Sequence, residues 1–157
     1  MDSHLVSYNT DTQTVNWHLY YGNRTPIGSN AKLDRDDTDS YGPETTTLTS
    51  IDDNATYKYY IFNYSGDAPL KDSDAKVDVV YDGRIYHSEV PYEDGNAWKV
   101  FEITDGVLTM CETNCMSDNE SARRDTISYD DIYNMRVDVS EQNSLRKIEE
   151  DIQSSVK

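Results

Sequence analysis

The sequence predicts an all-β protein, built as a two-sheet antiparallel sandwich and followed by a C-terminal helix. Residues 3 to about 110 contain short runs that alternate apolar and polar side chains and are rich in Thr, Val and Tyr. Asp-Gly dipeptides at Asp82-Gly83 and Asp105-Gly106 separate pairs of these runs, and this dipeptide is typical of tight hairpin turns. An apolar stripe at helical spacing follows residue 140.

Eight strands are expected in chain order. In the run 76–81, Val77, Val79 and Tyr81 share one face while Lys76 and Asp78 occupy the other, which is typical of a half-buried strand. Eight short strands with tight turns favour a sandwich of the prealbumin or immunoglobulin type. The expected strands are 4–8, 14–21, 45–50, 56–64, 75–81, 84–90, 97–103 and 107–110.

The 157 residues are enough for one domain. We expect the sandwich to span 1–110 and a polar extension, 111–139, to pack on it or lead away from it. Residues 140–157 are expected to form the helix, which packs on the sandwich or acts as a stalk. Its apolar stripe consists of Leu145, Ile148, Ile152 and Val156.

Acidic residues outnumber basic ones 30 to 14, which gives a net charge of −16. Such a chain repels phosphate backbones and anionic lipid surfaces, so nucleic acid is excluded as a partner. No apolar run approaches the ~18 residues of a membrane span, and membrane insertion is not expected. Cys111 and Cys115 are four positions apart, and the sequence leaves open whether they are bonded or reduced.

The densest acidic segment is 33–44, and it predicts a calcium site. Ca²⁺ takes six to eight oxygen ligands, which closely spaced aspartates can supply. The segment is not an EF-hand, because Asp39 stands where that loop needs Gly. The alternative is a solvated acidic loop. The candidate ligands are Asp34, Asp36, Asp37 and Asp39.

Two histidines form a second candidate site. Asp2 and His4 share one face of the first expected strand, and His18 lies on the face of the second that is opposite Trp17 and Leu19. If these strands pair, the imidazoles lie close together, and with Asp2 they suit zinc or a related ion. The alternative is ordinary surface or hydrogen-bonded histidines. His87 is left out, because no acidic neighbour is expected on its face.

No motif for catalysis is present: the sequence has no Gly-x-Ser-x-Gly elbow, His-Glu-x-x-His pair or phosphate-binding glycine loop. The protein is therefore not expected to be an enzyme. Tyr20, Tyr21 and Tyr41, with Tyr59 and Tyr60, are candidates for an exposed aromatic patch that binds a carbohydrate or a protein, although core packing would explain many of them equally well.

Three segments resemble an uncharacterised bacterial domain family of the YfaP type. They are Asp-Ser-His-Leu at 2–5, His-Leu-Tyr-Tyr-Gly-Asn at 18–23 and the acidic stretch 33–45, and the resemblance covers about residues 1–110. It implies a secreted, periplasmic or cell-surface location and attachment more than catalysis. Many members have a histidine where this chain has Phe62, and this departure favours oxygen ligands, and so calcium over zinc.

The function expected from the sequence is a metal-stabilised, non-catalytic binding or adhesion module of a bacterial exported or cell-surface protein. Calcium is the expected ion and zinc the alternative, and the expected partner is a protein or a carbohydrate at a cell surface. The other functions considered are a purely structural spacer and, last, a metal-dependent hydrolase that uses the histidines and aspartates around a bound water.

Overall fold

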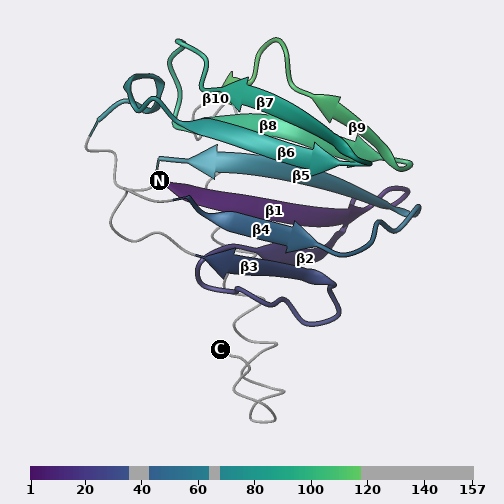
Figure 1. Cartoon of the computed structure of the whole chain (residues 1–157). Coiled ribbons are helices and arrows are strands. Elements are labelled where there is room, and N and C mark those ends of the chain that lie inside the picture. Colours follow the sequence, from purple (N-terminus) through teal and green to yellow (C-terminus); the bar gives the residue numbers. More distant parts are fainter. Residues whose placement is uncertain (36–42, 64–67, 118–157) are drawn as a thin grey trace.

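The computed structural model describes residues 1–35, 43–63 and 68–117 (Figure 1). These residues form ten strands and one short 3-10 turn, η1 (Leu70–Asp72). The eight expected strands are all present, with ends within two residues of the expected ones, and β3 and β10 are additional. The strands are β1 (Asp2–Asn9), β2 (Val15–Leu19), β3 (Ala31–Arg35), β4 (Thr45–Leu48), β5 (Ala55–Phe62), β6 (Lys76–Tyr81), β7 (Arg84–Glu89), β8 (Ala97–Thr104), β9 (Val107–Met110) and β10 (Met116–Ser117).

All strand pairs in this part of the chain are antiparallel, which confirms the all-β class. A six-stranded sheet has the order β10-β8-β5-β1-β2, and β9 also pairs with β8. The hairpins β3–β4 and β6–β7 are separate two-stranded sheets. The helix expected over 140–157 and most of the extension expected over 111–139 lie outside the described residues. No helix among the described residues is long and apolar enough to cross a membrane.

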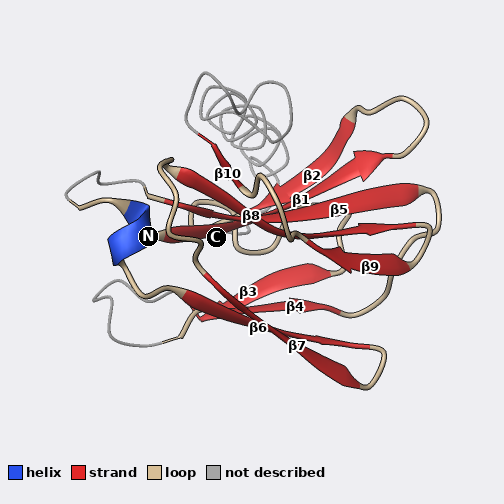
Figure 2. Cartoon of the chain, turned by 90° about the horizontal axis from the view of Figure 1, so that it is seen from above, coloured by secondary structure: helices blue, strands red, loops and turns tan. Residues whose placement is uncertain are grey.

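The two hairpins lie on one side of the six-stranded sheet (Figure 2). We call the sheet surface beneath them the hairpin face. Alternate residues of β1, β2, β5 and β8 are buried there together with Ala31 and Leu33 of β3, while Val77, Val79 and Tyr81 of β6 pack against them half-buried. The half-buried strand expected at 76–81 is therefore confirmed. The sheet contributes Leu5, Trp17, Leu19, Ala55, Tyr57, Tyr59, Trp98, Val100, Phe101 and Ile103.

Both Asp-Gly turns have the conformation that their sequence predicts. Asp82 and Gly83 have φ values of 51° and 74°, and Asp105 and Gly106 have 52° and 73°. Positive φ at both central residues matches the twist of the flanking strands. The Tyr81 hydroxyl donates a 2.6 Å hydrogen bond to the Gly106 carbonyl, which fastens the β6–β7 hairpin to the β8–β9 turn.

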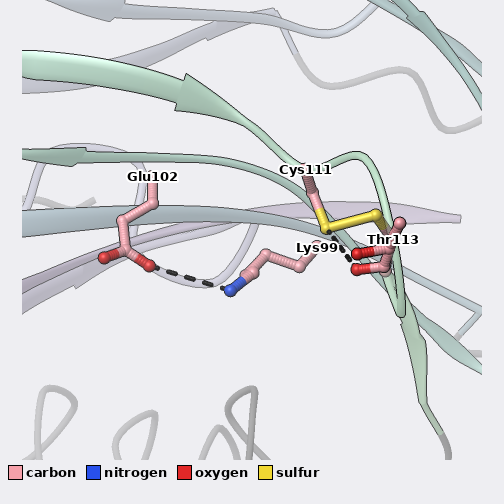
Figure 3. The surroundings of a disulfide bond; sticks show 5 residues. Lys99, Glu102, Cys111 and Thr113 are labelled. Atoms are coloured by element: carbon pink, nitrogen blue, oxygen red, sulfur yellow. Dashed lines mark hydrogen bonds and ion pairs between the residues drawn. A yellow bond between two sulfur atoms is a disulfide. The ribbon is translucent and has the colours of Figure 1, made fainter.

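A disulfide joins Cys111 to Cys115 between β9 and β10 (Figure 3). Both strands pair with the same edge of β8, at its opposite ends. Between them the Cys111 N–H donates to the Val100 carbonyl at 2.9 Å, and the Lys99 N–H donates to the Cys115 carbonyl at 2.8 Å. The disulfide thus closes a short loop on this edge, and regular pairing continues to Ser117, beyond the expected limit of 110.

Candidate functional site

The second face of the six-stranded sheet points away from the hairpins, and we call it the histidine face. At the end where β1 begins and β2 and β5 finish, its side chains are nearly all buried, although strand alternation alone would leave them exposed. Val6, Tyr60, Phe62 and Ala97 form a separate apolar cluster there. The buried members are His4, Val6, His18, Tyr20, Tyr60, Phe62 and Ala97.

His4 and His18 are in direct contact on this face. In the β1–β2 register Leu5 lies opposite Leu19 and Val6 opposite His18, so the two histidines are diagonal neighbours. His4 Nδ1 and His18 Nε2 are 2.8 Å apart, and one nitrogen donates its proton to the other. The side chains are 4% and 0% exposed, respectively. The closeness that strand pairing predicts for the two imidazoles is confirmed.

Aromatic rings and a tight turn hold the two imidazoles in place. The Tyr20 ring stacks on His18 at 4.5 Å and on His4 at 5.6 Å between centroids, while Phe62 meets His4 edge-on. Directly after β2, Gly22 lies against the Tyr20 ring: a Cβ there would come within 2.5 Å of Tyr20 Cε2. The Asn23 side chain donates a 2.9 Å hydrogen bond to the His18 carbonyl.

Asp2 is the third member of the candidate zinc site. It begins β1, lies opposite Phe62 of β5 and is half-buried, on the same face as His4. Across residues 1–35, 43–63 and 68–117, no group of three or more His, Cys, Asp or Glu side chains is arranged to hold a metal ion. The histidines are therefore a contacting pair, with Asp2 next to them along the strand.

Of the candidate calcium ligands, only Asp34 is described. Its carboxylate accepts a hydrogen bond from the Thr47 hydroxyl and forms an ion pair with Lys32 at 3.2 Å. The bonds from Thr47 and Lys32 lower the Asp34 pKa below its usual value. Asp36, Asp37 and Asp39 lie outside the described residues.

Strand β3 was not predicted from the sequence, because its last residues belong to the acidic segment 33–44. Ala31 and Leu33 are buried while Lys32 and Asp34 are exposed, so the alternation that marks a strand is present in the sequence. The density of aspartates after Leu33 favours a loop instead. The acidic segment therefore starts as a strand that packs on the core.

The sequence gives no indication that Glu44, the last acidic residue of the segment, reaches β1. It accepts hydrogen bonds from the Ser3 N–H, at 3.3 Å, and from the Ser3 hydroxyl. Ser3 lies between Asp2 and His4 but faces the hairpins, where the Tyr59 hydroxyl bonds the side chains of Ser3 and Thr46. Burial raises the Tyr59 pKa to about 12. This polar cluster brings the end of the acidic segment next to the residues that precede and follow Ser3.

The expectation of an exposed aromatic patch is wrong for most of its members. Tyr20, Tyr59 and Tyr60 are 1%, 8% and 0% exposed, because each fills space on one of the two sheet faces. Tyr21 is 39% exposed and meets the Tyr20 ring edge-on at 5.4 Å. Tyr41 lies outside the described residues.

The expectation that His87 has no acidic neighbour is also wrong. On the outer surface of the β6–β7 hairpin its Nδ1 lies 2.6 Å from Asp78 and its Nε2 lies 3.1 Å from Glu89. Asp78 is its cross-strand partner and Glu89 lies two residues further along β7, so both share its face. The two carboxylates raise the His87 pKa above its usual value, with Asp78 the larger cause.

Comparisons with known proteins give no relative: no family model, curated protein or solved structure matches this chain.

Proposed function

We propose that this chain is a metal-stabilised, non-catalytic binding or adhesion module of an exported or cell-surface protein. We further propose that its fold is a two-sheet sandwich of the YfaP type whose second sheet is divided into two hairpins. The proposal rests on one observation above all: His4 and His18, from separate strands, meet as a buried pair with 2.8 Å between their nitrogens.

Other candidate ligands lie at the same end of the fold. Asp2 starts β1, and Glu44 at the end of the acidic segment bonds Ser3 next to it. Residues far apart in the sequence are thus brought to the end of the fold at which β1 begins. A metal ion held there would fasten the start of β1 to its neighbours and stabilise the native state, because it binds that state alone.

The disulfide supports a location outside the cytoplasm. Cytosolic reductants keep thiols reduced, whereas secreted and periplasmic proteins retain such bonds. The Cys111–Cys115 bond and the charge of −16 are both compatible with a soluble domain of an exported protein. The partner would be a protein or carbohydrate at a cell surface, and Tyr21 is the exposed one of the candidate binding residues that the structure describes.

Thermal unfolding tests the metal dependence. The protein is stripped with a chelator and melted alone, with calcium and with zinc at equal concentration. A metal at about one hundred times its Kd adds about 2.7 kcal/mol, which raises the melting temperature by several degrees. Melting curves that are identical under all three conditions would refute a metal-stabilised module.

A purely structural spacer is the second candidate, because the two histidines already hydrogen-bond to each other and stack on Tyr20. That contact and the stacking hold the two buried rings together without any ion. Under this function, chelator, calcium and zinc leave the melting temperature unchanged, and glycan arrays and pull-down experiments give no partner. The same melting experiment therefore separates the two functions.

A further inference from the structure

We propose that the histidine face is a docking surface for the chain's own C-terminal segment: residues 140–157 lie across its buried half as an amphipathic helix. The stripe that covers the face consists of Leu145, Ile148, Ile152 and Val156. This inference goes beyond the proposed function, because it needs no metal ion and concerns how the fold is completed. It also chooses packing on the sheet over a stalk for this part of the chain.

The buried half of the histidine face requires a covering layer. Val6, Tyr60 and Phe62 on this face are 0%, 0% and 2% exposed. An uncovered strand surface of the same molecule gives the comparison: Val80 and Ile85 are cross-strand partners on the outer surface of the β6–β7 hairpin, and they are 72% and 74% exposed. A sheet face buries its apolar side chains in this way only against another element.

The described strands do not supply that layer. Both hairpins lie on the opposite side of the six-stranded sheet (Figure 2). The other described strands belong to the sheet itself, and η1 packs its buried Leu70 into the core of the hairpin face. The cover of the histidine face is therefore assigned to residues outside the described ranges.

The buried half also lies where the described part of the chain ends. Ser117, its last residue, pairs with Ala97 of β8, and Ala97 belongs to the buried apolar cluster of this face. Further along the same face, Lys58 and Glu102 are cross-strand partners and are only half-buried. The burial is therefore concentrated beside the point from which residues 118–157 continue.

Composition selects the occupant among the remaining residues. The segment 36–42, which connects β3 to β4, has no aliphatic side chain, and the segment 64–67 has only four residues. Within 118–157, the apolar stripe of residues 140–157 repeats at intervals of three and four. That spacing is typical of a helix that buries one side and exposes the other, which is the form of element that covers a sheet face.

The dimensions agree with this packing. Residues 140–157 would form a helix about 27 Å long. The buried half of the face extends from β2 through β1 and β5 to β8, and four strands at a spacing of about 4.8 Å are roughly 14 Å across. The connecting residues 118–139 can extend over roughly 70 Å, so the helix can reach this face while the sheet keeps its arrangement.

A single spin label on the full chain tests the packing. The two cysteines of the chain are bonded to each other, so Gln153→Cys supplies one reactive thiol beside the stripe. Paramagnetic broadening is read by NMR of the 15N-labelled protein against the same sample with the label reduced. We expect the backbone amide signals of Val6 and Tyr60 to lose most of their intensity. The signals of Val80 and Ile85, on the far side of the molecule, should keep theirs.

Two variants that flank the label provide a matched comparison. Ile152→Asp places a carboxylate on the stripe and should abolish the loss of signal at Val6 and Tyr60, because a buried charge without a partner is strongly unfavourable. Ser154→Asp adds the same charge on the opposite side of the helix and should leave the loss unchanged. Both variants leave the described residues untouched, so the sheet itself remains the reporter.

Three outcomes would overturn the inference. Signal loss at neither surface, or at Val80 and Ile85 instead, would show that residues 140–157 project as a stalk or pack elsewhere. A loss that persists in Ile152→Asp would assign the cover to another part of 118–157. A mixture of spin-labelled 14N protein with unlabelled 15N protein detects a second copy, and signal loss in that mixture would assign the cover to a neighbouring molecule. None of these readings uses calcium or zinc, so the melting experiment judges the proposed function separately.

Discussion

The two faces of the six-stranded sheet are both buried where β1 begins, but their chemistry differs. On the hairpin face, aliphatic and aromatic side chains from the sheet meet Leu33, Val77 and Val79 of the hairpins. On the histidine face, two imidazoles and Tyr20 stack and hydrogen-bond beside a smaller apolar cluster. Strand β1 contributes Leu5 to the first face and His4 to the second.

The difference indicates what each face does. Apolar packing such as that of the hairpin face stabilises in proportion to the area removed from water and needs no particular partner atoms. Burying an imidazole costs free energy unless each of its nitrogens has a suitable partner. The position of a buried histidine is therefore more specific than the position of a buried apolar side chain. Stability should therefore depend mainly on the hairpin face, and the proposed metal binding on the histidine face.

Replacing a large side chain on the hairpin face should have the greatest effect on stability. Trp98, 1% exposed, lies in the main core. Trp98→Ala should lower the free energy of unfolding by about 3–5 kcal/mol, because it leaves a cavity. Urea denaturation measures the loss, and Val80→Ala, at a side chain 72% exposed, is the control with a change of at most about 0.5 kcal/mol. A loss below about 1 kcal/mol would show that the hairpins do not close this face.

The buried phenol of Tyr59 should make the hairpin face sensitive to alkali. Its pKa is raised from 10 to about 12, so the stability of the neutral phenol is fully present below pH 10 and is lost as the pH rises toward 12. Two pKa units correspond to about 3 kcal/mol. The loss is measured by urea denaturation between pH 9 and about pH 12. Tyr59→Phe should remove that part of the decline, and an identical decline in the variant would contradict this origin.

Crowding the turn beside Tyr20 tests the histidine face. Gly22→Ala places a methyl group 2.5 Å from a ring that is 1% exposed, so the ring must leave its stack on His18. Forcing extra volume into a packed site costs about 1–3 kcal/mol. Denaturation gives the loss, and NMR of the His18 ring shows whether the stack is broken. An unchanged His18 spectrum would mean that Tyr20 does not fix the imidazoles.

The smallest effect on stability is expected at His87, the exposed histidine. Asp78 and Glu89 raise the His87 pKa above 6.5. Its contribution to stability is therefore fully present below pH 6.5 and is lost as the pH rises through the folded-state pKa. An NMR titration should show this pKa above 6.5, and Asp78→Asn should lower it. A midpoint at or below 6.5 would show that the carboxylates do not act on the ring.

The period-two alternation of the sequence was enough to predict eight strands and the contact between His4 and His18. It did not predict β3, because the alternation there extends over only five residues and the aspartates that follow Leu33 are more typical of a loop. It also failed for Tyr20, Tyr59 and Tyr60, because alternation tells which residues share a face but not whether a second layer covers that face. The bond between Ser3 and Glu44 joins residues 41 positions apart, so no local pattern could reveal it.

The short strands on the outer edge of β8 affect how the protein behaves in concentrated solution. An exposed edge strand is a template on which another molecule can polymerise. In the described chain this edge consists of two short strands, β9 with four residues and β10 with two, and the disulfide-closed loop lies between them. Along residues 107–117 a second molecule therefore finds no long run of strand to pair with, and we expect this edge to resist fibre growth while the disulfide is intact.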